Sequence, residues 1–328
     1  MPIVVNSNAS ATEASFNLSR NNEALRKSLG RLSSGKRISN PADDAGGLAV
    51  AYKLNSTINR SYATIQNAQN SLSYLQVQDS SLATVGKILD RMAELRTMAQ
   101  DITKNSGDIE NYSKEFIELQ SQLRQIKEEK FNGISLFSVR DATAAGSKAQ
   151  MTKATGGGVY VDASGASIAY NKFGRELVTH PSGNTGNGSI SLNVVNLQFV
   201  LSLNGSANAG INLGGIGHTN SGITTTALGD DNFITRIRDV SVSEIINAIE
   251  KLADARAENG AEQNRIMNSI NLLQTNVTNL EAAHGRIMDA DIALESTRFA
   301  RYNVLVQASA AMTAQANQMT NIALSLLG

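Results

Sequence analysis

The sequence predicts a mainly α-helical protein: a long antiparallel, coiled-coil helical bundle formed by both ends of the chain, with a small β-rich region inserted between them. Three observations predict it. Apolar residues recur at alternating steps of three and four near both ends. No proline interrupts residues 42–104. Between residues 138 and 231, Gly, Ser, Ala, Asn and Thr dominate, and an alternation of period two replaces the helical period.

The first predicted helix spans about residues 9–33, because its leucines share one apolar seam with the steps of a heptad. Ser33, Ser34 and Gly35 end it. The leucines of this seam are Leu18, Leu25, Leu29 and Leu32.

The next helix is predicted to start at Pro41, with Asn40 as its N-cap residue. The carboxylates of Asp43 and Asp44 would complement the positive end of its dipole. The alternative, a paired acid and base, would need a cleft and a further polar partner. The periodicity continues to about Lys104, which gives roughly 90 Å of helix, too long for the interior of an ordinary globular domain.

After a break at residues 105–108, a shorter helix on Tyr112 to Ile126 is expected to run antiparallel to the long one. Phe131-Asn132-Gly133-Ile134 is a turn that leads into a strand. In the inserted region, strands are expected at 159–161 and 190–194. The alternation shifts phase at Val195 and continues to Leu203, which predicts a bulge or a turn between strands.

Helical periodicity returns at Ser243 and continues to Ile287. A terminal helix follows, and its last stretch, Tyr302–Gly328, contains no charged residue but many amides and alanines. Such a helix suits burial among similar helices, because no ionised group must be desolvated; a frayed polar tail is the alternative. Its seam carries Leu305, Met312, Met319, Ile322 and Leu326.

Composition excludes several classes of function. The chain has 29 basic and 29 acidic residues, so no net charge favours nucleic acid, and we expect no membrane insertion. Cysteine is absent, which excludes disulfides and thiol chemistry. Residues 1–11 do not resemble a cleaved secretory signal, so export would use another route. The histidines His180, His218 and His284 stand apart without metal-ligand or catalytic spacing, so we expect no catalytic, cofactor or metal site and no enzyme.

One local charge excess stands out near the end of the first helix. If that helix lies antiparallel to the last one, its basic residues approach the acidic start of the last helix, and their attraction would set the register. We therefore interpret these charges as register charges rather than as a nucleic-acid patch, which would carry interleaved aromatic residues. The register charges are Arg26, Lys27, Arg31, Asp289 and Asp291.

Several motifs, in the same order along the chain, resemble those of bacterial flagellins. They lie between Met1 and Phe137 and between Phe233 and Gly328, and the middle of the chain matches no motif. Hook–filament junction proteins are also similar at the termini, but the density of motifs at both ends favours the filament subunit. The motifs are Leu32–Ile38, Asn40–Ala45, Phe131–Gly133, Gln263–Arg265, Gln315–Gln318 and Leu324–Leu327.

The resemblance implies a structural subunit that polymerises into the extracellular flagellar filament and serves swimming motility. Residues 1–40 with 289–328 would form an inner domain of terminal helices, which assemble through the apolar seams named above. Residues 41–137 with 233–288 would form a long-helix domain with the hairpin, and 138–232 a variable outer region. The resemblance also implies export in an unfolded state, with an export apparatus, an export chaperone, a filament cap and hook-junction proteins as partners.

The family's innate-receptor surface would fall on Arg91, Leu95 and Glu118, for which ordinary subunit packing is the alternative interpretation. The middle of the chain allows two further classes of function, an enzyme and an adhesin. An inserted enzyme needs a metal or nucleophile cluster between Phe137 and Asp231, where the sequence has none. An adhesin would bind cells or glycans through that segment.

Overall fold

The computed structural model describes residues 8–137, 152–153, 158–161, 167–170, 172–202, 234 and 236–327. The chain divides into two compact units. The first consists of Met1–Asn59 together with Asn276–Gly328, and the second is Arg60–Thr275. Long helices make up most of both units, and a small set of strands belongs to the second, so the predicted fold class is confirmed.

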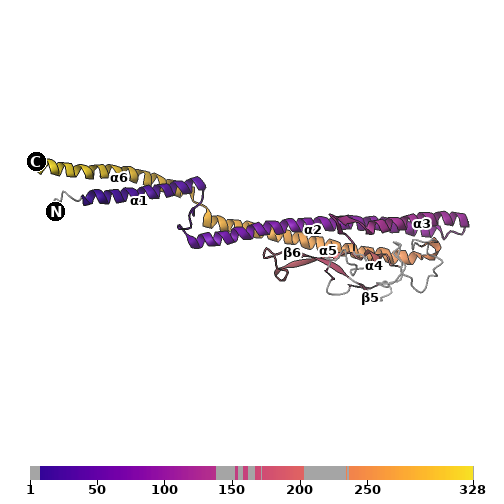
Figure 1. Ribbon diagram of the computed structural model, residues 1–328. Coiled ribbons are helices and arrows are strands. Elements are labelled where there is room, and N and C mark those ends of the chain that lie inside the picture. The colour runs from indigo at the N-terminus through magenta and orange to yellow at the C-terminus, as the bar shows by residue number, and fades with distance from the viewer. Residues whose placement is uncertain are drawn as a thin grey trace. The chain divides into compact units, whose positions relative to one another are not determined.

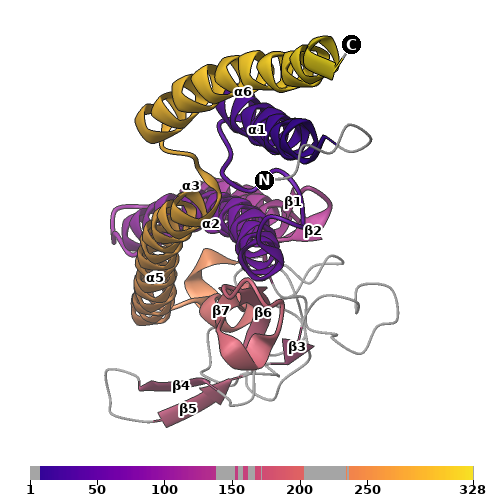
Figure 2. The same cartoon turned by 90° about the vertical axis from the view of Figure 1, so that its left-hand side faces the viewer.

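The first unit contains the two terminal helices, α1 (Ala9–Ser34) and α6 (Ile292–Leu327), which lie antiparallel and side by side (Figures 1 and 2). Helix α1 begins where the side chain of Asn8 accepts a hydrogen bond of 3.0 Å from the Ala11 N–H. It ends at Gly35, whose φ of 68° is left-handed and therefore suits glycine. The observed bounds differ from the predicted ones by a single residue at the C-terminus.

The second helix of the chain, α2 (Ala45–Met98), begins later than predicted. Asn40 does not cap it; instead the Asn40 carbonyl accepts the Asp43 N–H at 3.0 Å in a preceding turn. The capping group is Asp44, whose carboxylate accepts the Gly47 N–H at 2.8 Å. The prediction of a start at Pro41 was wrong because a carboxylate one turn downstream satisfies the free N–H groups of the helix.

The second unit is built on the rest of α2, on α3 (Ser106–Lys127) and on most of α5 (Val242–Met288), which run antiparallel to α2 (Figure 1). Ion pairs fix both registers: Arg91 of α2 pairs with Glu115 of α3 at 2.7 Å, and Asp79 pairs with Arg256 of α5 at 3.0 Å. A short 3-10 helix, η3 (Ile237–Asp239), precedes α5.

A tight hairpin follows α3, as predicted. Strands β1 (Lys130–Phe131) and β2 (Ile134–Ser135) pair across a two-residue turn. Asn132 and Gly133 have positive φ values of 50° and 78° there, the conformation of a type I′ hairpin turn.

The described residues of the inserted region form two small antiparallel sheets (Figure 2). One has the order β3 (Thr152–Lys153), β6 (Phe173–Val178), β7 (Ser189–Val194), with the 3-10 helix η1 (Thr185–Asn187) between β6 and β7. The other pairs β4 (Gly158–Val161) with β5 (Ser167–Tyr170). The strands predicted at 159–161 and 190–194 are therefore confirmed.

The predicted continuation of the strand after Val195 was wrong. Residues Leu197–Val200 form a short helix, α4, whose N-cap residue Asn196 accepts the Phe199 N–H at 3.2 Å. The Asn196 side chain caps a turn and so competes with an extended backbone. The apolar side chains at 197, 199, 200 and 201 are all buried in this helical arrangement. Leu203, where the predicted strand ends, lies outside the described residues.

The core of the second unit lies between the helices and the base of the sheet. Its fully buried side chains include large apolar residues from α2, α3 and the segment after β2, and buried amides accompany them. Among the described helices, none is long and apolar enough to cross a membrane. The largest of these buried side chains are Phe116, Phe137, Leu75, Leu82, Leu89, Met92, Leu95, Leu123 and Leu136.

Candidate assembly surface

The helix pair α1–α6 carries the residues that the sequence predicts for assembly. Polar side chains tie the two helices at three levels: Asn8 Nδ2 donates to the Ala316 carbonyl at 2.8 Å, Asn21 Nδ2 to Ser309 Oγ at 2.9 Å, and Ser28 Oγ to the Glu295 carbonyl at 3.3 Å. As the residue number rises along α1, the number of its partner on α6 falls, as an antiparallel pair requires. The terminal helices therefore pack through amides and hydroxyls as well as through apolar groups.

This pair has almost no interior of its own. Ser28 is the one buried residue of α1, and among the described side chains of α6 only Glu295 and Ala316 are buried. The predicted seam residues Leu18, Leu25, Leu32 and Leu305 are half-buried. Two packed helices cannot enclose a core by themselves, so their apolar side chains stay partly in water.

Two of the predicted seam residues face solvent: Leu29 is 53% exposed and Met312 is 63% exposed. The side chains of Met319, Ile322 and Leu326 lie outside the described part of the chain. Sequence reasoning missed further exposed apolar residues, because they lie off the heptad seam. These are Phe16, Ile292, Leu294 and Val304, which are between 50% and 67% exposed.

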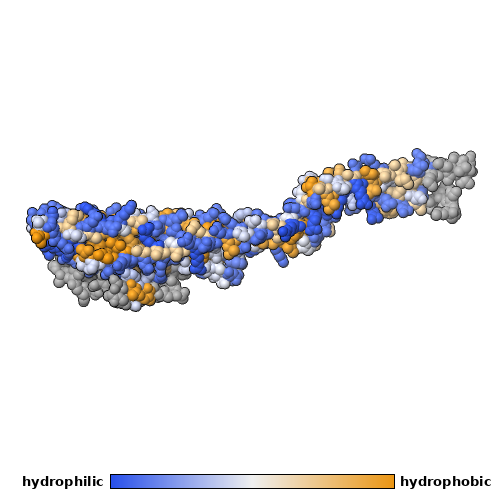
Figure 3. Space-filling model, turned by 180° about the vertical axis from the view of Figure 1, so that it is seen from behind, coloured by the Kyte–Doolittle hydropathy of each residue, from blue (hydrophilic) through white to orange (hydrophobic). Residues whose placement is uncertain are grey.

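The helix pair presents patches of hydrophobic surface. Figure 3 shows hydrophobic surface on the α1–α6 pair interleaved with hydrophilic surface. Of the charged residues that α6 contains, the last is Arg301, so the helix has no formal charge beyond it. The part of α6 beyond Arg301, which is apolar and amide-rich without ionised side chains, is costly to hydrate and cheap to bury.

A small junction closes the pair where α1 ends and α6 begins. The Arg37 N–H donates to the Met288 carbonyl at 2.6 Å, and the Ala290 N–H donates to the Gly35 carbonyl at 2.9 Å. Lys36 and Asp289 form an isolated antiparallel bridge between these bonds. Ile38 and Met288 are buried against α2 side chains beneath it. The junction is therefore held by backbone hydrogen bonds, and the Arg37 guanidinium adds two more to the Ile287 carbonyl, at 3.0 and 2.9 Å.

The charges at this junction follow a different pattern from the predicted one. Lys27 pairs with Asp43 at 2.6 Å, and Arg31 lies between two carboxylates, at 3.9 Å from Asp43 and 4.0 Å from Glu295. The hydrogen bond from the Lys27 ammonium lowers the pKa of the Asp43 carboxyl, against a smaller opposing effect of desolvation. Arg31 thus contacts α6 through Glu295, whereas Lys27 pairs with an acidic residue that precedes α2, and the role of both as register charges stays a prediction.

The other three predicted register charges take other positions. Asp291 caps α6, since its carboxylate accepts the Ala293 and Leu294 N–H groups at 3.0 and 3.1 Å. Asp289 joins the bridge through its backbone. Among the ion pairs of the described residues, none includes Arg26, which is exposed.

The predicted receptor surface lies in the second unit. Arg91 is partly exposed and pairs with Glu94 and Glu115 at 3.0 and 2.7 Å. Glu118 is exposed on α3, but Leu95 is fully buried. The structure therefore does not present the three side chains together, and receptor recognition stays a prediction.

The described residues offer no cluster of three or more metal-ligating side chains. His180 contacts Ser182 at 2.8 Å, a local turn contact. His284 is half-buried on α5, and His218 lies outside the described residues.

Comparison with known proteins identifies the ends of the chain. Residues 5–142 match the model of the bacterial flagellin N-terminal helical region, and residues 242–327 match that of the bacterial flagellin C-terminal helical region. The first match contains α1, α2, α3 and the β1–β2 hairpin, and the second contains α5 and α6.

Whole proteins match as well. The chain is 30% identical over 334 residues to flagellin of Bacillus subtilis, covering 98% of this chain and 99% of that one. It is 28% identical over 331 residues to the flagellar filament 33 kDa core protein of Treponema phagedenis, covering 99% of this chain and all of the relative. A solved structure described as a flagellar hook-associated protein from Vibrio parahaemolyticus shares the fold, with a TM-score of 0.53 and 17% identity over 75% of this chain and all of that one. The chain belongs to the bacterial flagellin family, as the sequence motifs suggest.

Proposed function

We propose that the α1–α6 pair drives polymerisation of this chain, and that its exposed apolar side chains become buried against other copies. As a flagellin, the chain is a structural subunit of the extracellular flagellar filament, which serves motility. The observation that carries the proposal is the exposure of Phe16 and Val304, at 67% and 64%, on a helix pair whose described side chains enclose almost no core. Full burial of one such side chain is worth about 1.5–3 kcal/mol.

The charge distribution supports the same role. Beyond Arg301 no ionised group of α6 would have to be desolvated when copies pack together, and its amides can pair across the contact. At the opposite end of the helix pair, Arg31 of α1 lies 4.0 Å from Glu295 of α6, and this contact supports a role of Arg31 in the register of the two helices. Contacts between unlike surfaces of successive copies do not close, so the product is a helical filament.

The finer organisation follows from the same proposal. Residues 1–40 with 289–328 would line the filament core, residues 41–137 with 233–288 would make lateral contacts, and residues 138–232 would face outward. We propose export in an unfolded state by the flagellar export apparatus with a chaperone, followed by addition beneath a filament cap. The absence of cysteine supports this route, because no disulfide can obstruct threading.

Seeded elongation tests the role of the terminal helices. Purified chain should elongate filament fragments, while a version that ends at Arg301 should stay monomeric, because it lacks the uncharged part of α6. Elongation by the shortened chain at the normal rate would refute the role of the tail.

A matched pair of substitutions makes the test specific to the surface. Val304 on α6 and Val159 on β4 are each 64% exposed. Val304→Asn should raise the critical concentration for elongation by about tenfold, and Val159→Asn should leave it unchanged. Equal effects of the two variants would assign assembly to a surface other than the helix pair.

A further inference from the structure

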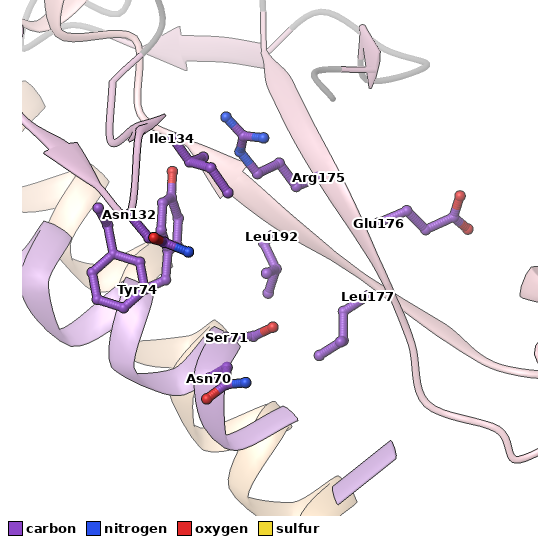
Figure 4. Close-up of a pocket in the computed structure, with 10 residues that line it drawn as sticks. Asn70, Ser71, Tyr74, Asn132, Ile134, Arg175, Glu176, Leu177 and Leu192 are labelled. Carbon is purple, nitrogen blue, oxygen red and sulfur yellow. The ribbon is translucent and has the colours of Figure 1, made fainter. Parts of the chain in front are cut away.

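A groove in the second unit is built from three separate elements. It has a volume of about 630 Å³ and lies between α2, the β1–β2 hairpin and strands β6 and β7. Figure 4 shows Asn70, Ser71 and Tyr74 on the helix side, with Leu177 and Leu192 facing them from the sheet. In the same view Arg175 stands at one end of the groove, while the carboxylate of Glu176 points away from it. The groove therefore combines apolar and aromatic side chains with polar ones, and it has a cation at one end.

The walls of this groove are held in place before anything binds. Tyr74 is 5% exposed, and its hydroxyl donates to the Ser135 carbonyl at 3.0 Å. Its ring meets the Phe131 ring edge-on at 6.1 Å, and the Arg175 guanidinium lies over it at 6.0 Å. A rigid groove of this volume costs little to order when it accepts a side chain.

A rigid apolar tip stands at the far end of the same helix. Ile102 is 98% exposed, the highest exposure among the large apolar side chains described. It belongs to the turn between α2 and α3, in which Asp101 Oδ1 accepts the Thr103 N–H at 2.9 Å. The Lys104 N–H donates to the Asp101 carbonyl at 3.3 Å, and Asn105 and Asp108 form a capping box that starts α3. Single exposed apolar residues are common, but this one is presented by a hydrogen-bonded turn and is β-branched, so little entropy is lost when it docks.

We propose that Ile102 of one copy docks into the Tyr74–Leu177 groove of the next copy along the filament. This inference rests on the proposed self-assembly and names one of its contacts. The exposed Asp101 carboxylate beside Ile102 would approach the Arg175 guanidinium at the end of the groove, so the charges of tip and groove are complementary.

Two other hollows of this unit fit the tip less well. One, of about 330 Å³, lies along α3 and is lined by Glu115 and Glu118, which would repel Asp101. The other, between β5 and α5, has a volume of about 20 Å³, which is too small for an isoleucine side chain. Size and charge together therefore favour the Tyr74–Leu177 groove.

The arrangement also predicts a spacing. Tip and groove are different surfaces of one unit, so their contact is heterologous and can repeat along an open filament. Along α2, Tyr74 and the helix end at Met98 are about 36 Å apart, and the turn adds a few residues beyond it. Copies related by this contact should therefore be offset by about 40 Å along the helix direction.

Cysteine cross-linking tests the contact directly, because the chain contains no cysteine. Chains with Thr103→Cys, which keep Ile102, and chains with Ser71→Cys are mixed, co-polymerised on seeds and oxidised. Cross-linked dimers should appear that join position 103 of one chain to position 71 of another, and neither variant polymerised alone should give them. Filaments in which no such dimers form, with disulfides or with short bismaleimide linkers, would overturn the inference.

Elongation kinetics give a second readout with a matched control. Ile102→Ser should raise the critical concentration about tenfold, while Ile246→Ser, at an exposed position on α5, should not. Unchanged elongation by Ile102→Ser would contradict the docking. Failure of the unmodified chain to elongate seeds would instead refute the proposed function, so the two failures are distinguishable.

Discussion

The backbone N–H of Asn193 donates a hydrogen bond of 2.9 Å to the Glu262 carboxylate and so joins β7 to α5. The Asn193 side chain donates to Glu258 at 2.7 Å, and Lys172 pairs with that same carboxylate. Burial raises the pKa of Glu262 from 4.5 to about 7, and the neighbouring Glu258 adds to the rise. The Asn193 hydrogen bond, Lys172 and Arg265 oppose it. The attachment of the sheet to the helix therefore includes a carboxyl that titrates near neutral pH.

Stability should fall as pH rises through this range. The pKa of Glu262 is higher in the folded than in the unfolded chain, so between pH 4.5 and about 7 the folded state keeps a proton that the unfolded state has lost. The contribution is complete below pH 4.5 and is lost above about pH 7. Glu262→Gln stays neutral, so it should raise the free energy of unfolding at pH 8 by about 1–3 kcal/mol and flatten the slope. Urea unfolding at pH 5 and pH 8 measures both effects.

The control for this prediction is Glu118→Gln, which neutralises an exposed carboxylate on α3. It should leave the difference between pH 5 and pH 8 unchanged. A Glu262→Gln variant with the slope of the unmodified chain would show that another group carries the pH dependence.

The second prediction compares substitutions of Arg31 and Arg26, because the sequence assigns both residues to the register charges but only Arg31 forms ion pairs among the described residues. The Arg31 side chain is 18% exposed and lies between Asp43 and Glu295, which are 10% and 6% exposed. Arg31→Met should destabilise the terminal unit by about 1–2 kcal/mol, since each carboxylate keeps one other cation, Lys27 or Arg298. Arg26→Met should cost less than about 0.5 kcal/mol. Amide exchange in α1 and seeded elongation report the difference, and equal effects would contradict the assignment.

The chain reversals and helix ends that the sequence predicted well are those at which a residue has a positive φ. Gly35 ends α1 with a left-handed φ of 68°, and Asn132 and Gly133 turn the hairpin with positive φ values. Glycine and asparagine tolerate this region of backbone space better than other residues, so their position is a strong signal. The start of α2 was missed because Asn40 and Asp44 are both good caps, and sequence alone does not decide between them.

The assembly surface was predicted only in part, for a physical reason. Heptad spacing finds residues that face the partner helix within the chain, such as Leu25 and Leu305, which are half-buried. It does not find the exposed apolar side chains Phe16 and Val304, because these lie off the seam. Helices in a polymer have more than one contact face, so a single periodicity describes only one of them.

Gln78 connects α2 to the segment that leads into the insertion, and it gives a third prediction. Its Nε2 donates to the Leu136 carbonyl at 2.7 Å, and its Oε1 accepts from Asn259 of α5 at 2.9 Å. The side chain is fully buried. Gln78→Leu should destabilise the second unit by about 1–3 kcal/mol, because both partners lose a hydrogen bond in a buried place.

The matched control is Gln76→Leu, an exposed position on the same helix. It should change stability by no more than about 0.5 kcal/mol. Denaturant unfolding of both variants, followed by circular dichroism, measures the contrast. If Gln78→Leu is as stable as the unmodified chain, the buried amide is dispensable and apolar packing compensates for it.

Two glycines of the second unit predict opposite signs for the same substitution. Gly133 has a φ of 78° in the hairpin turn, and a Cβ there would meet no atom within 4 Å, so the cost of Gly133→Ala comes from the backbone alone. It should be about 1 kcal/mol. Gly260 lies within α5, where a Cβ also meets nothing within 4 Å. Gly260→Ala should stabilise the unit by about 0.5–1 kcal/mol, because alanine loses less backbone entropy in a helix. Thermal unfolding of the two variants measures the sign of each change in stability. Destabilisation by Gly260→Ala would contradict the prediction for this position.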